Sequence, residues 1–85
     1  MMSERAIEIV KHINSMIQGT LAVYFYDFEI GYDDDCIDEV NTQLTNQGYF
    51  VIVDKDPIHQ FDTKVHKLKT YRRITVSVSK SITRL

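Results

Sequence analysis

The sequence predicts a small α+β domain: a three-stranded sheet with two helices on one face, in the order α-β-α-β-β. Two segments repeat apolar residues at helical spacing, and each is followed by a glycine. Three other segments are rich in β-branched and aromatic residues, and the last of them alternates strictly between apolar and polar. A chain of 85 residues with 44% apolar content fits one domain, 1–85, and is not typical of disorder.

Residues 3–18 are predicted to form the first helix. Ser3 is a suitable N-cap, and Gly19 stands where a helix-ending residue belongs. One apolar stripe runs along the segment and would face the core: Ala6, Ile9, Val10, Ile13, Met16 and Ile17.

Residues 21–30 are predicted to form the first strand, and both of its faces are apolar. If Leu21, Val23 and Phe25 face the helices, the other face is open and presents aromatic side chains to a partner. Tyrosine is enriched at such interfaces because it combines a large contact area with a hydroxyl. The alternative is that these aromatic residues pack in the core. The side chains concerned are Tyr24, Tyr26 and Phe28.

The second helix is expected to run from one of the residues 33–35 to about Gln47, with Gly48 ending it. Its inward side would hold Ile37, Val40 and Leu44, with Cys36 beside them. A strand over 49–54 and a turn closed by Pro57 follow, and residues 58–68 are either a long loop or a loop with one irregular turn. The last strand covers about 70–79, pairs with 49–54, and points Ile74, Val76 and Val78 to one side. The first two strands could be parallel through a crossover.

Acidic residues are dense between Asp27 and Glu39, where the chain has seven. A calcium-binding loop is excluded, because Asp38 stands where such a loop requires glycine. The cluster is either a solvated helix start, favoured by the helix dipole, or a docking surface for a basic partner. The docking residues would be Asp33, Asp34, Asp35, Asp38 and Glu39.

Basic residues gather in the last quarter of the chain. Residues 64–85 hold seven bases and no acid, whereas residues 1–63 carry a net charge of −9. Cations with an interleaved aromatic residue can bind phosphates and stack on a base, which makes nucleic-acid binding the alternative function. A solvated strand that resists aggregation and a contact with another protein are the other interpretations. The residues that would contact nucleic acid are Lys67, Lys69, Tyr71, Arg72 and Arg73.

No pattern of catalytic or metal-binding residues stands out. The spacing of His12, His59, His66 and Cys36 matches no zinc site, so no metal and no cofactor are expected. Cys36 lies among acids that would raise its pKa, which disfavours a nucleophilic role. We therefore expect a protein that is not an enzyme. A single cysteine, no signal-peptide pattern and no long apolar run indicate a soluble, cytoplasmic protein that binds no membrane.

The order of these elements resembles that of small accessory proteins of tailed bacteriophages. The matching pieces are Ile9 to Ile17, Val23 to Phe25, Ile37 to Leu44, Gly48-Tyr49 and Tyr71 to Ser77. The acidic cluster departs from that pattern. The resemblance implies a virion component or an inhibitor of host machinery, and no catalytic residue. The expected function is thus a protein-interaction module whose partner is a host protein or its own copies, as a homodimer or higher oligomer.

Overall fold

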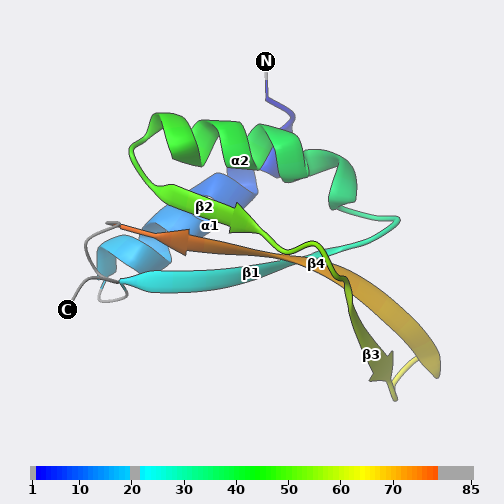
Figure 1. The fold of residues 1–85 in the computed structure, drawn as a ribbon. Helices are drawn as coiled ribbons and strands as arrows, with labels where there is room; N and C mark the ends of the chain where they lie inside the picture. Colours follow the sequence, from blue (N-terminus) through cyan, green and yellow to red (C-terminus); the bar gives the residue numbers. More distant parts are fainter. Residues whose placement is uncertain (1, 20–21, 79–85) are drawn as a thin grey trace.

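The computed structural model describes residues 2–19 and 22–78, which form two helices and a four-stranded antiparallel sheet (Figure 1). Leu21 and the predicted end of the last strand, Ser79, lie outside the described residues. The elements are α1 (Glu4–Gly19), β1 (Val23–Glu29), the 3₁₀ turn η1 (Asp34–Cys36), α2 (Ile37–Asn46), β2 (Phe50–Val53), β3 (Ile58–Asp62) and β4 (Lys67–Ser77).

Helix α1 begins as its sequence predicts. The Ser3 hydroxyl accepts a hydrogen bond from the Ala6 amide at 3.2 Å, which satisfies an otherwise unpaired donor of the first turn. The predicted apolar stripe is buried except for Met16, which is exposed at its margin. The stripe residues in the core are Ala6, Ile9, Val10, Ile13 and Ile17.

Helix α2 follows its predicted apolar pattern, but it begins at Ile37, after the 3₁₀ turn η1, and no side chain of residues 33–35 caps it. Val40 and Leu44 are fully buried, and Ile37 packs against the core from its margin. The chain leaves the helix through Gly48, whose φ of +97° is a conformation that glycine adopts without a steric penalty. The helix therefore turns sharply into β2 at that residue.

The sheet is built around β4, with β1 along one edge and β2 and β3 along the other (Figure 1). Strands β1 and β2 both run antiparallel to β4, so they are parallel to each other, but β4 separates them. The predicted pairing of 49–54 with the last strand is confirmed. The prediction of a three-stranded sheet with a loop over 58–68 is wrong, because Ile58–Asp62 forms a fourth strand that pairs with the first part of β4.

The expected orientation of β1 is wrong. Tyr24 pairs with Val76 and Tyr26 with Ile74, and those two β4 residues are completely buried. Directly paired residues lie on the same face of a sheet, so the tyrosines face the helices together with Phe28, which is also completely buried. Phe25 lies on the opposite, open face.

Both helices cover the same face of the sheet, but they do not cover all of it. The hydrophobic core joins residues of α1 and α2 to Phe28, Ile74 and Val76. Beyond the end of β1, only β3 accompanies β4, and this two-stranded ribbon extends away from the helices (Figure 1). We call residues 58–71 the arm and the rest of the described chain the body.

Candidate binding surfaces

Asp33, one of the predicted docking residues, is a structural residue. It is only 7% exposed. The Arg5 guanidinium donates to both of its carboxylate oxygens, at 3.0 and 3.1 Å. This pairing raises the pKa of Arg5, mainly through the hydrogen bonds to Asp33. The bidentate pair holds the start of α1 to the loop after β1, which leaves Asp33 unsuited to docking a partner.

Two more of the predicted docking residues have internal partners. The Asp34 carboxylate accepts from the Gly31 amide at 2.9 Å. Glu39 Oε1 accepts from the Ser3 amide and from the Ser3 hydroxyl, each at 3.1 Å. Among the residues described, Asp35 and Asp38 are the two members of the cluster that are exposed and have no such contact. The acidic segment therefore largely closes the loop and anchors α1.

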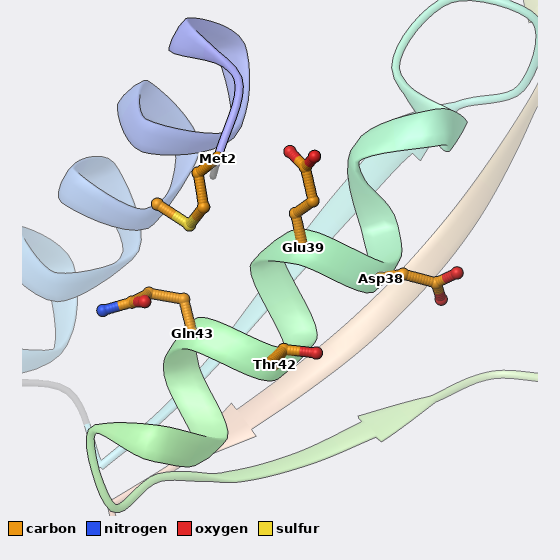
Figure 2. A pocket seen from close by; sticks show the side chains of 5 residues that line it. All are labelled: Met2, Asp38, Glu39, Thr42 and Gln43. Carbon is orange, nitrogen blue, oxygen red and sulfur yellow. The ribbon is translucent and has the colours of Figure 1, made fainter.

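A shallow depression of about 490 Å³ lies between the chain start and α2. Figure 2 shows Met2, Glu39 and Gln43 on the side of α2 nearest the start of α1, whereas the Asp38 carboxylate points away from them. Glu39 is already bonded to Ser3. The polar groups of this depression do not converge on one point, as they do in small-molecule sites.

Tyr24 and Tyr26 contact His12 of α1. His12 Nε2 lies 2.8 Å from the Tyr24 hydroxyl oxygen, and the imidazole meets both phenol rings edge to face. Tyr26 stacks in the same way on Phe28, with ring centroids 5.0 Å apart. Partial burial raises the pKa of Tyr26 and keeps its phenol neutral. These aromatic residues join α1 to the sheet. They therefore pack toward the core, as the alternative interpretation of this strand expected.

The open face of the sheet carries an apolar surface that the sequence analysis missed. Phe25 and Ile52 both pair with Thr75, one from each side of β4, and Phe50 pairs with the nearby Ser77. These three large side chains are respectively 56%, 64% and 44% exposed. We call Phe25, Phe50 and Ile52 the open-face patch.

An ion pair borders the open-face patch. Arg73 and Asp27 are cross-strand partners, and their side chains form two hydrogen bonds of 2.8 and 3.1 Å. The hydrogen bonds to Asp27 raise the pKa of Arg73. The guanidinium also lies 5.4 Å from the centroid of the Phe25 ring, a cation–π distance. Arg73 is thus fixed beside the patch.

The predicted nucleic-acid residues are divided by the fold. Lys67, Lys69, Tyr71 and Arg73 occupy alternate positions of β4 and share the open face, whereas Arg72 points to the other side. Arg72 donates to the backbone oxygens of Asp54 and Lys55. Lys69 forms an ion pair of 3.3 Å with Asp62, and the hydrogen bond within this pair raises the pKa of Lys69. Three of the four cations are therefore held in internal contacts.

The arm carries a second exposed apolar surface, also missed by the sequence analysis. Phe61 and Leu68 are directly paired on the side of the arm that continues the helix-covered face, where no helix lies beneath them. They are 59% and 65% exposed, and Val65 in the turn is 52% exposed. We call Phe61, Val65 and Leu68 the arm patch.

The candidates for redox or metal chemistry are dispersed. Burial raises the pKa of the Cys36 thiol, which lies 3.8 Å from the Ser3 hydroxyl oxygen. A buried thiol held protonated is a poor nucleophile. Within residues 2–19 and 22–78, no group of three or more His, Cys, Asp or Glu side chains is close enough to hold a metal ion. No helix in this part of the chain has the length and apolar character needed to cross a membrane.

Comparisons with known proteins found no matching family model, no similar curated protein and no similar solved structure.

Proposed function

We propose that this chain is a non-enzymatic protein-interaction module that binds its partner through the open-face patch. The observation that carries the proposal is the exposure of Phe25, Phe50 and Ile52 on one sheet face, on the two strands that flank β4. Large exposed apolar side chains gathered on one sheet face are a mark of protein–protein interfaces, because their burial removes apolar area from water. This surface lies on the face of β1 opposite to the predicted one, because Tyr24, Tyr26 and Phe28 pack toward the helices.

The charged border supports binding to another protein. Core residues of protein interfaces are apolar and aromatic, and polar groups form the rim. Here Asp27 and Arg73 form that rim, and their mutual ion pair leaves little net charge to repel an apolar partner. The roles expected of phage accessory proteins, assembly component or inhibitor of a host protein, both need such a surface.

Nucleic-acid binding by residues 64–73 has less support. Binding to phosphates relies on free cations, which displace the counterions of the nucleic acid. Lys69, Arg72 and Arg73 already have internal partners. The acidic docking surface is weakened for the same reason, because Asp33, Asp34 and Glu39 are engaged.

The test compares wild type with Ile52→Asp, which places a charge at the most exposed residue of the open-face patch. Tyr32→Asp is the matched control, because Tyr32 is 73% exposed and belongs to neither patch. Binding is measured by sedimentation velocity of the pure protein and by quantitative capture from a lysate of its source cells.

We expect Ile52→Asp to weaken binding of the partner at least about tenfold, the loss typical of a central interface residue. Tyr32→Asp should bind as wild type does. The proposal is overturned if Ile52→Asp retains the wild-type affinity, or if the wild type binds no protein in either assay. Urea unfolding of each variant shows that the fold is intact.

A further inference from the structure

The molecule exposes two apolar surfaces that cannot cover each other. The open-face patch lies on the side of the sheet opposite the helices, as the exposure of Phe25 and the burial of Ile74 and Val76 on the other side show. The arm patch lies on the other side, because Leu68 has the same parity along β4 as the buried Ile74 and Val76. The arm is a direct extension of the same sheet, so it cannot fold back onto its own open face without breaking β4.

The two surfaces suit each other in size and chemistry. The open-face patch spans three neighbouring strands, or about 10 Å at a spacing of about 4.8 Å. The arm is a two-stranded ribbon about 5 Å across, so its facing pair, Phe61 and Leu68, is narrow enough to lie on the open-face patch. Sheet faces pack on one another at about 10 Å through such side chains.

Charge favours contact between the arm of one copy and the body of another. Residues 58–71 hold Lys64, Lys67 and Lys69 against Asp62, a net charge of +2. The body, which includes Arg72 and Arg73 of β4, holds eleven acids and five bases, a net charge of −6. An arm is therefore attracted by the body of a second copy, whereas two bodies repel each other.

We propose that the arm of one copy packs its Phe61, Val65 and Leu68 surface onto the Phe25, Phe50 and Ile52 surface of a second copy. This inference rests on the proposed function, since it names the partner of the open-face patch. The contact joins two different surfaces, so it is heterologous: it closes into a ring or a reciprocal dimer, or it continues as a chain of copies.

The experiment uses two variants that are each defective in a different half of the contact. Leu68→Asp damages the arm patch and Ile52→Asp the open-face patch, and Tyr32→Asp is the control. Both damaged positions are about two-thirds exposed, so the substitutions should leave the fold intact. Sedimentation velocity over a range of protein concentrations measures association of each protein alone, and of the two defective variants mixed in equal amounts.

We expect each defective variant alone to associate at least about tenfold more weakly than wild type. The equimolar mixture should recover pairing with an affinity within about threefold of a single wild-type contact, because an intact arm of one variant meets an intact patch of the other. The double variant Lys64→Glu/Lys67→Glu should associate about threefold to tenfold more weakly than wild type. The difference in affinity should be smaller at high salt.

Three outcomes overturn the inference. If Ile52→Asp abolishes association and Leu68→Asp does not, two open faces meet each other, and the proposed function stands without the arm. If the mixture fails to recover pairing, the arm and the patch are not partners. If the wild type is a monomer up to ~1 mM, where a contact of about 4 kcal/mol would show, the second copy is excluded and the open-face patch binds a different protein or none.

Discussion

The body and the arm share one strand, yet they bury it differently. In the body, Ile74 and Val76 of β4 are completely covered by the two helices. In the arm, Leu68 lies on the same side of the same strand and is mostly exposed. The alternating pattern continues across both regions, and only the helical layer stops (Figure 1). Alternation thus determines which side a residue faces, whereas burial depends on whether a second layer reaches it.

The strongest test of this contrast removes one phenylalanine from each region. Phe28→Ala in the body should lower the free energy of unfolding by about 3–5 kcal/mol, because it leaves a cavity in a closed core. Phe61→Ala in the arm should change it by less than about 0.5 kcal/mol, because that side chain is largely in water already. Urea unfolding followed by circular dichroism measures both. Similar losses for the two variants would mean that the arm is packed in solution.

A second comparison concerns two arginine–carboxylate pairs in the body. Arg5→Ala should cost about 1–3 kcal/mol, because it leaves the buried Asp33 carboxylate without its main partner. Arg73→Ala should cost less than about 1 kcal/mol, because Asp27 stays partly solvated on the open face.

Asp33→Asn combined with Arg5→Ala separates the two effects in a double-mutant cycle. The cycle should show a clear coupling energy for this pair. If the two arginine variants are equally stable, the buried position of Asp33 has no energetic consequence.

The smallest expected effect is a difference in pH response. Burial raises the pKa of Cys36 in the body above its ordinary value of 9.0, so the unfolded chain loses this proton first as the pH rises. The contribution of the Cys36 thiol to the free energy of unfolding is therefore fully present below about pH 9 and decreases above it. In the arm, the Lys64 amide and, to a lesser extent, Lys69 lower the pKa of Asp62 from 3.8, so its contribution holds above about pH 4 and is lost in acid.

Two measurements check these opposite directions. Urea unfolding between pH 7 and pH 10.5 should show a decline in stability that Cys36→Ser reduces. Amide exchange at Lys64 should accelerate in wild type as the pH falls below about 4, relative to its intrinsic rate, and Asp62→Asn should remove that change. A decline at alkaline pH that is identical in Cys36→Ser would exclude the thiol as its source.

The helices and most of the strands could be predicted because local signals agree there. Ser3, Gly48 and the apolar stripes mark both helices, and only the start of α2 stayed open among residues 33–35. Strand β3 could not be predicted from such signals. It alternates weakly, and its turn to β4 lacks an Asn-Gly or Asp-Gly pair and instead holds His66 at a φ of 52°. Pairing with β4, which is a tertiary contact, defines β3.

The binding surface was predicted on the wrong side of β1 for a specific reason. Both faces of this strand are apolar near its start, so periodicity does not choose between them. A signal was available further along, where Asp27 and Glu29 share the parity of Phe25. Carboxylates are rarely placed toward a core, so those two residues indicate that Phe25 faces outward. The arm patch had no such signal, because its exposure results from where the helices end.

The pairing of β4 with every other described strand has a consequence for synthesis. Strands β1, β2 and β3 bond to β4, and β4 is the last of the four along the chain. On the ribosome, the two helices and three strands therefore emerge before any of those strands has its partner. The pairing of β1 with β4 joins residues 42 to 54 positions apart, and such long-range contacts slow folding and leave apolar strands uncovered in the nascent chain.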